Sequence, residues 1–148
     1  MKHEFPIHSG LVDQVVISTG VAGLIGRATC MQLAKAGARL CLVDPEAERL
    51  DAFTNEIARE IPDARLLAVS DCDTSSASAV DKLLDRVEGE LGPIGSLINS
   101  AYPRTSDWHL RFEQIPMESW RENVDAHLNG YAFGGRTSRV IPFTFNLN

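Results

Sequence analysis

Short apolar runs alternate with longer amphipathic stretches along most of this sequence, and the alternation restricts the possible folds more than any single motif. The apolar runs predict strands at residues 12–18, 38–44, 65–70 and 94–99. The amphipathic stretches predict helices at residues 24–36, 45–60 and 116–133, and a further helix that follows N-cap candidates at Thr74 to Ser76 and continues to Leu91, before Gly92-Pro93. Strands joined by helices of this length run parallel, because each crossover returns the chain to the same end of the sheet. The pattern therefore predicts an α/β fold, a doubly wound parallel sheet in a three-layer αβα arrangement.

The first strand and the first helix are joined by a turn that contains Gly20, Gly23 and Gly26. A tight turn, a close backbone approach and close helix-strand packing each exclude a Cβ at such positions. Free amides at the start of the following helix favour a diphosphate. Asp44 ends the second strand, where a carboxylate can accept both hydroxyls of an adenosine ribose and repels a 2′-phosphate. The combination predicts NAD in preference to NADP.

Two alternatives stay open around this turn. The glycines could form a plain turn, with Asp44 only capping the helix that is expected to begin at Pro45. Arg27 lies beside the turn, where it could reach a phosphate or could simply be a solvated helix residue.

Composition narrows the classes of partner. The chain has 148 residues, a formal net charge of -6 and no cluster of Lys and Arg, which argues against nucleic acid and anionic membrane surfaces. It has no apolar run near the roughly 20 residues that cross a bilayer and no secretory signal at its amino terminus. The three widely spaced cysteines fit reduced thiols better than a disulfide framework or a metal site. We expect one cytoplasmic domain that binds no metal.

Several segments taken together resemble the amino-terminal half of a short-chain dehydrogenase/reductase. They are "TGVAGLIG", "LVD" after the second strand, Asp73-Thr74, "LGPIGSLINSA" and the "W...N" helix, and they span about residues 10–133. The glycine spacing is TGxxGxxG, a variant of the more usual TGxxxGxG. The resemblance implies a Rossmann-like fold and an NAD-dependent oxidoreductase, with residues 1–133 as the dinucleotide-binding domain and 134–148 as an atypical tail.

The resemblance also implies which residues bind the cofactor. The three glycines of the turn would line the diphosphate, Asp44 would bind the adenosine ribose, and Asp73 would contact the adenine edge. Residues 99–101 would pass beside the nicotinamide ribose. Tyr102 follows them at a position where the family has a glycine. The implied set is Thr19, Gly20, Gly23, Leu24, Ile25, Gly26, Asp44, Asp73, Thr74, Asn99, Ser100 and Ala101.

Some of these polar residues also have purely structural interpretations. Asp73 and Thr74 could cap the next helix, and Asn99 could satisfy local backbone groups. His127 lies near the apolar face of the last helix, where the family usually has an asparagine. A hydrogen-bonded structural role is expected for it, and a titrating role stays open.

The family's catalytic Ser and Tyr-x-x-x-Lys have no counterpart in this sequence, because Tyr102 is followed by Ser106 and Tyr131 by Gly135. We therefore expect a carboxyl-terminally truncated Rossmann-like domain without catalytic residues. Gly134-Gly135 is expected to break the last helix. Beyond it, the alternation of Phe143, Phe145 and Leu147 suggests a half-buried strand. This atypical segment could come from a shifted reading frame or an alternative exon, or it could be a tail that folds back on the sheet edge.

An uncovered sheet edge and helix face would then favour a homo-oligomer or a partner chain. The segments "SAYPR" and "HLNGY" are similar to a subgroup linked to bacterial surface-sugar and flagellin-glycan modification, which implies a small carbonyl or sugar-derived substrate. Two further functions stay open. One is a non-catalytic NAD-binding or interaction module that pairs with another chain, and the other is a methyltransferase-like nucleotide binder, since an acidic residue after the second strand also suits the ribose of S-adenosylmethionine.

Overall fold

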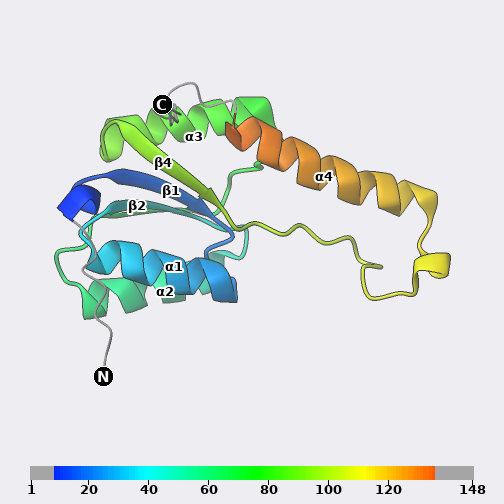
Figure 1. The fold of residues 1–148 in the computed structure, drawn as a ribbon, viewed down its shortest axis with the longest axis horizontal. Coiled ribbons are helices and arrows are strands. Elements are labelled where there is room, and N and C mark those ends of the chain that lie inside the picture. Colours follow the sequence, from blue (N-terminus) through cyan, green and yellow to red (C-terminus); the bar gives the residue numbers. More distant parts are fainter. Residues whose placement is uncertain (1–8, 136–148) are drawn as a thin grey trace, which may run out of the picture.

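The computed structural model describes residues 9–135, which form a four-stranded parallel sheet with helices on both faces (Figure 1). The strands are β1 (Val15–Thr19), β2 (Arg39–Val43), β3 (Leu66–Val69) and β4 (Ile94–Asn99). The helices are α1 (Leu24–Lys35), α2 (Ala47–Glu60), α3 (Ala77–Glu90) and α4 (Met117–Gly135), with short 3-10 turns η1 (Ser9–Leu11) and η2 (Phe112–Gln114). The predicted doubly wound, Rossmann-like α/β fold is confirmed.

The strand order is β3-β2-β1-β4, so the chain first moves outward from β1 and then returns to the other side of it. The register pairs Thr19 with both Val43 and Asn99, and Val43 with Val69. All four strands therefore end along one edge of the sheet. The reversal of strand order between β1 and β4 makes this edge the place where doubly wound sheets bind ligands.

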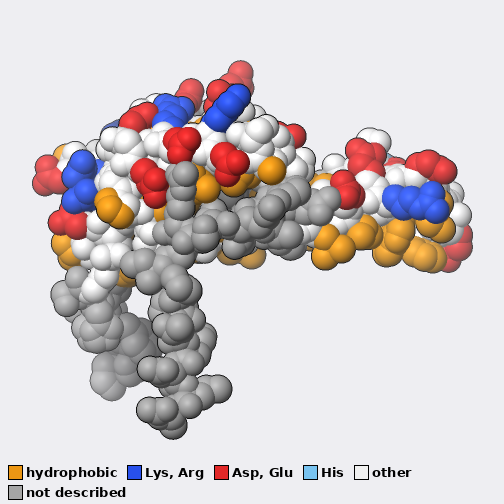
Figure 2. Space-filling view, turned by 90° about the horizontal axis from the view of Figure 1, so that it is seen from above, with side chains coloured by type: hydrophobic (Ala, Val, Ile, Leu, Met, Phe, Trp, Pro, Cys, Tyr) orange, Lys and Arg blue, Asp and Glu red, His pale blue; other side chains and the backbone are white. Residues whose placement is uncertain are grey.

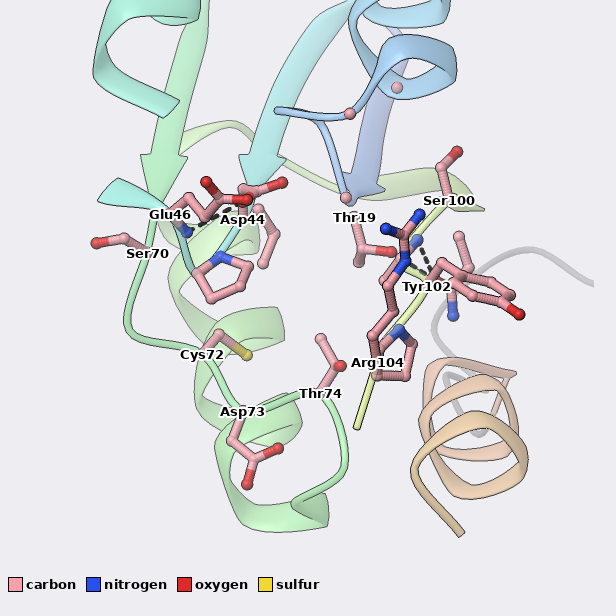
Figure 3. Close-up of a pocket in the computed structure, with 18 of the residues that line it drawn as sticks. Thr19, Asp44, Glu46, Ser70, Cys72, Asp73, Thr74, Ser100, Tyr102 and Arg104 are labelled. Carbon is pink, nitrogen blue, oxygen red and sulfur yellow. Dashed lines mark hydrogen bonds between the residues drawn. The ribbon is translucent and has the colours of Figure 1, made fainter. Parts of the chain in front are cut away.

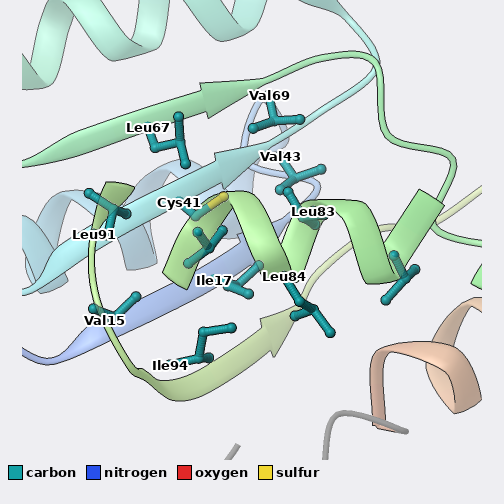
Figure 4. Close-up of a cluster of buried hydrophobic side chains, with 12 residues drawn as sticks. Val15, Ile17, Cys41, Val43, Leu67, Val69, Leu83, Leu84, Leu91 and Ile94 are labelled. Carbon is teal, nitrogen blue, oxygen red and sulfur yellow. The ribbon is translucent and has the colours of Figure 1, made fainter. Parts of the chain in front are cut away.

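Two apolar cores hold the layers together, because side chains that alternate along each strand point to opposite faces. One core lies between the sheet and α3, where Ile17 and Cys41 meet Leu84 and Val87 (Figure 4). The other lies between the sheet and helices α1 and α2, where Leu40 packs with Phe53 and Ile57. The strand ends are thus held between two packed layers.

Three predicted boundaries differ from the structure by two or more residues. The first strand begins at Val15 instead of residue 12, since Asp13 has φ of 62° in a turn and its amide bonds Gly37. Helix α2 begins at Ala47 instead of Pro45, after Glu46 at its N-cap. Helix α4 is described as far as Gly135, two residues beyond its predicted end, so both glycines are helical, and whether the helix breaks after them lies outside the described residues. A helical glycine costs only ~1 kcal/mol relative to alanine, which a long helix tolerates.

The extended segment that follows β4 leaves the body of the molecule, and helix α4 runs back from its far end toward α3, so that the two together form an arm (Figure 1). A row of hydrophobic side chains follows one edge of the arm (Figure 2). Among the described side chains of α4, the exposed large hydrophobic residues are Met117, Trp120, Val124 and Leu128, which are 36–63% exposed. In the part of the chain that the structure describes, no helix has the length and apolar character to cross a membrane. The proposed strand at Phe143, Phe145 and Leu147 lies outside the described residues.

Candidate functional site

A large cavity opens at the carboxyl ends of the strands, with a volume of about 1480 Å³ (Figure 3). Pockets that bind drug-sized ligands have volumes of roughly 300–1,000 Å³, so this cavity has room for a larger ligand such as a dinucleotide. The structure places every residue of the predicted set on its wall, namely Thr19, Gly20, Gly23, Leu24, Ile25, Gly26, Asp44, Asp73, Thr74, Asn99, Ser100 and Ala101. Their binding of a cofactor stays a prediction, while their convergence on one cavity is a property of the fold.

The glycine turn needs its glycines because other backbone atoms lie too close to leave room for a Cβ. Gly20 has φ of +67°, and a Cβ on it would lie 2.6 Å from the Ser100 carbonyl oxygen. A Cβ on Gly26 would lie 2.3 Å from the Gly20 carbonyl oxygen. Gly23 precedes α1 and provides no capping side chain, so no side chain caps the first turn, whose residues Leu24, Ile25 and Gly26 line the cavity. The turn offers a bare, electropositive backbone surface.

Asp44 is 5% exposed and joins the second strand to the glycine turn. Its Oδ2 accepts a hydrogen bond from the Ala22 amide at 2.8 Å, and its Oδ1 accepts one from the Glu46 amide at 3.0 Å. The N-cap of α2 is Glu46, so Asp44 is not simply the cap of that helix. A carboxylate has about four lone-pair sites, and these two bonds use two of them.

Arg49 braces the same turn from α2, and no sequence pattern predicted this. One guanidinium nitrogen donates to the Ala22 carbonyl at 2.6 Å and another to the Glu46 carboxylate at 2.7 Å. The bond and the charge of Glu46 raise the pKa of Arg49 above its usual value. Arg27, by contrast, forms an ion pair with Glu56, covers the Phe53 ring at 4.6 Å and is not among the lining residues. The alternative that Arg27 reaches a phosphate gains no support.

The ends of β1 and β4 are tied by one side-chain pair. The Thr19 hydroxyl donates to Asn99 Oδ1 at 2.6 Å, and the Ala101 amide donates to the same oxygen at 3.2 Å. Asn99 therefore does satisfy a local backbone group, as one interpretation predicted, and also fixes the exit of β4 against β1.

Asp73 lies on the cavity wall after β3 (Figure 3). Its carboxylate accepts hydrogen bonds from the Ser75 hydroxyl at 2.6 Å and the Ser75 amide at 2.9 Å, and these bonds hold the pKa of Asp73 below its usual value. The cap of α3 is Ser76, whose hydroxyl accepts from the Ala79 amide at 3.4 Å. The predicted capping role thus belongs to Ser76, and neither Asp73 nor Thr74 provides it.

Past β4 the wall of the cavity is aromatic and basic. The Tyr102 ring meets the His127 ring of α4 edge-to-face, with centroids 4.6 Å apart. The Arg104 guanidinium carbon lies 4.3 Å from the Trp108 ring centroid and 5.7 Å from that of Tyr102. Sequence reasoning assigned no role to Arg104. The signal available was the order Tyr, Arg, Trp at two- and four-residue spacing within "YPRTSDW".

One free thiol, Cys72, lines the cavity (Figure 3). Among the described residues, no three His, Cys, Asp or Glu side chains are grouped so that they could hold a metal ion. The three cysteines are free thiols. Burial raises the pKa of Cys41 to about 12, and it also raises the pKa of Cys30 and Cys72.

Comparison with known proteins gives a consistent result. A family model described as short chain dehydrogenase matches residues 14–139. Epidermal retinol dehydrogenase 2 of Mus musculus is 36% identical over 119 residues, 80% of this chain and 38% of that protein. NAD+-bound xylitol dehydrogenase is similar in fold, with a TM-score of 0.73 at 23% identity over 84% of this chain and 46% of that one. An NADPH-bound short chain oxidoreductase of Pseudomonas aeruginosa PAO1, with an atypical catalytic center, has a TM-score of 0.73 at 28% identity, over 84% and 48%.

The chain thus spans about half, or less, of the length of each of these proteins. One of the two similar structures holds NAD+ and the other NADPH, so likeness alone does not choose between the two cofactors. The match to a dehydrogenase family model removes the reason for a methyltransferase-like alternative.

Proposed function

This chain belongs to the short-chain dehydrogenase family, and on that premise we propose that it forms the cofactor-binding part of an NAD-dependent oxidoreductase. The glycine turn supports a bound diphosphate, because a Cβ at Gly20 or Gly26 would fill the space that the bare backbone leaves. Asp44 would hold the adenosine ribose, and Asn99 with Ala101 would lie toward the nicotinamide. When bound, NAD would supply a hydride acceptor or, once reduced, a hydride donor.

The position of Asp44 is the observation that favours NAD over NADP. Its buried carboxylate lines the cavity beside Glu46, whose own carboxylate is bonded to Arg49. A 2′-phosphate would bring further negative charge to this point. Two like charges about 6 Å apart repel by about 3 kcal/mol at an effective dielectric constant near 20. Since about 1.4 kcal/mol is a tenfold change in affinity, the arrangement should prefer NAD by well over tenfold.

Calorimetric titration of the purified chain with NAD and NADP tests this proposal. Asp44→Asn should reduce the preference for NAD at least tenfold, because it removes the charge while keeping the size of the side chain. Asp51→Asn is a matched control, since Asp51 is an exposed carboxylate of α2 that does not line the cavity. A wild-type chain that binds neither dinucleotide, or that prefers NADP, contradicts the proposal.

A small carbonyl or sugar-derived compound is the proposed substrate class. The reaction needs a proton donor close to the substrate oxygen, and the sequence contains no Tyr-x-x-x-Lys to provide one. NAD binding without turnover of carbonyl compounds would support the second candidate, a non-catalytic NAD-binding module that acts with another chain.

We also propose that the apolar edge of α4 contacts a second copy of the chain or a partner chain. Trp120 and Leu128 are 49% and 63% exposed there, in a row that extends over the whole arm (Figure 2). Exposed apolar surface of this kind marks protein interfaces. Light scattering at several concentrations should give a mass above the 16.2 kDa of one chain. The proposed location is the cytoplasm, which the free thiols support and cell fractionation can test.

A further inference from the structure

The charges around the cavity are divided between its two sides. Carboxylates line the side formed by the loops after β2 and β3, at Asp44, Glu46, Asp71 and Asp73. Two arginines also line the cavity, and one of them, Arg49, is bonded to Glu46. The other is Arg104, on the segment that follows β4. In the described part of the chain, Arg104 takes part in no hydrogen bond or ion pair and contacts only aromatic rings.

Those rings hold Arg104 without neutralising it. Its guanidinium carbon lies 4.3 Å from the Trp108 centroid and 5.7 Å from the Tyr102 centroid, both within the range of a cation–π contact. Tyr102 is itself held edge-to-face against His127 of α4. In Figure 3 the Arg104 side chain extends into the cavity, toward the strand ends that carry Thr19 and Ser100. The aromatic contacts restrict a long side chain in advance, so less entropy is lost when it binds something.

An arginine in this state has one clear use. A guanidinium has five N–H donors and no acceptor, and its fork matches the oxygens of a carboxylate or phosphate. The carboxylates of this cavity lie with the loops of the other side, and none of them is bonded to Arg104. The donors of Arg104 therefore stay available for a ligand that brings its own anionic oxygens.

We propose that Arg104 is the anion-binding residue of this cavity and that its guanidinium binds anionic oxygens of the bound ligand. Two sources of those oxygens share this chemistry: the diphosphate of the dinucleotide, and a carboxylate or phosphate group of the substrate. The inference rests on the proposed function, because it assumes that the cavity takes a nicotinamide dinucleotide. It adds a residue that determines specificity, on the side of the cavity away from Asp44.

Calorimetry on the full chain tests the proposal with four probes: NAD, adenosine, inorganic pyrophosphate and, after saturation with NAD, oxalate. Arg104→Gln removes the charge and Arg104→Lys keeps it while losing the fork. Arg65→Gln is the control, because Arg65 is an exposed arginine just before β3, at the opposite edge of the sheet. Tyr102→Ala removes one aromatic contact, and Tyr102→Phe keeps the ring.

If Arg104 binds the diphosphate, Arg104→Gln weakens NAD and pyrophosphate at least tenfold and leaves adenosine unchanged. If it binds the substrate, NAD keeps its affinity while oxalate no longer binds the NAD-loaded variant. In both cases the affinity of Arg104→Lys for the affected probe lies between those of the wild type and Arg104→Gln. Tyr102→Ala loses part of the affinity that Arg104→Gln loses, and Tyr102→Phe and Arg65→Gln keep the wild-type affinity.

Other outcomes overturn the proposal. Equal affinities of the wild type and Arg104→Gln for NAD, pyrophosphate and oxalate would show that Arg104 only packs against the rings. A parallel loss of adenosine affinity would show that the variant disturbs the whole cavity. A wild-type chain that does not bind NAD contradicts the proposed function, and the pyrophosphate titration then decides the role of Arg104 separately.

Discussion

Gly26→Ala tests the central packing relation of this site, the contact between the first turn of α1 and the glycine turn before it. The added Cβ would lie 2.3 Å from the Gly20 carbonyl oxygen and 2.7 Å from Val21 Cα. Carbon and oxygen pack at roughly 3.3–3.6 Å even in close contacts, so the helix and the turn must move apart by about 1 Å. Both neighbours are backbone atoms, and no change of side-chain rotamer can make room.

The expected effect has two parts. Overpacking of this kind destabilises a protein by about 1–3 kcal/mol, which lowers the Tm of a domain of this size by roughly 3–10 °C. The same displacement moves the bare backbone on which we propose that the diphosphate binds, so NAD affinity should fall at least tenfold. Thermal unfolding followed by circular dichroism and NAD titration by calorimetry measure the two parts separately.

Gly89→Ala provides the matched control within the same chain. Gly89 lies near the end of α3, and its added Cβ meets nothing within 4 Å. The same substitution should therefore stabilise the protein there, by about 0.5–1 kcal/mol through helix propensity, and leave NAD affinity unchanged. A Gly26→Ala chain that unfolds at or above the wild-type Tm would refute the packing argument. A less stable variant with unchanged NAD affinity would refute the link between this turn and the diphosphate.

Three further outcomes follow from single interactions. Thr19→Val removes the hydroxyl bonded to Asn99, and urea unfolding should show a loss of about 1 kcal/mol. The pKa of Cys41 is raised to about 12 from 9.0, so its contribution to stability is complete below pH 9 and decreases as the pH rises toward 12; Cys41→Ala should flatten this decrease in alkaline unfolding curves. The hydrogen bonds of Ser75 lower the pKa of Asp73, so they stabilise the fold above the unfolded pKa and lose this effect as the pH falls through the folded one. NMR titration of Ser75→Ala should show that pKa returning toward its ordinary value.

The order of elements was predictable because apolar periodicity and chain reversal act over a few residues. The boundaries of the elements were less predictable, because they depend on single hydrogen bonds that the apolar periodicity does not indicate. The amide of Asp13 bonds Gly37 and delays the first strand. Asp44 accepts from the Glu46 amide just before α2, which therefore begins after Pro45. In both cases an aspartate next to an apolar run, a residue typical of turns, was the signal that could have corrected the boundary.

The candidate cavity was predictable for a topological reason. Strand ends in a parallel sheet meet at one edge, so residues that follow the strands are brought together however far apart they lie in the sequence. Gly20 and Ser100 come into contact range in this way, although one follows β1 and the other β4. The glycine spacing predicted that the loop after β1 would have exposed backbone, and Asp44 indicated a carboxylate in the loop after β2.

The partners of the arginines near the cavity could not be predicted from the sequence. Arg27 is next to the glycine turn in the sequence and was a cation that could have reached a phosphate, yet it forms an ion pair with Glu56 of α2. Arg49 enters the cavity wall but is bonded to Glu46. Arg104, distant in the sequence from the glycine turn, extends into the cavity with only aromatic contacts in the described part of the chain.

The effect of an arginine at this site therefore depends on its ion-pair or aromatic partner and not on its distance in sequence from the glycine turn. The partners of long side chains are set by the folded structure and cannot be read from the sequence. The same principle gives the cavity a direction. We propose that carboxylates on the β2 and β3 side oppose a 2′-phosphate, and that the Arg104 guanidinium on the β4 side, which has no ion pair among the described residues, attracts anionic oxygens. A dinucleotide without a 2′-phosphate, bound with its neutral adenosine ribose at Asp44 and with anionic oxygens toward Arg104, would satisfy both sides, whereas a 2′-phosphate would bring negative charge to Asp44.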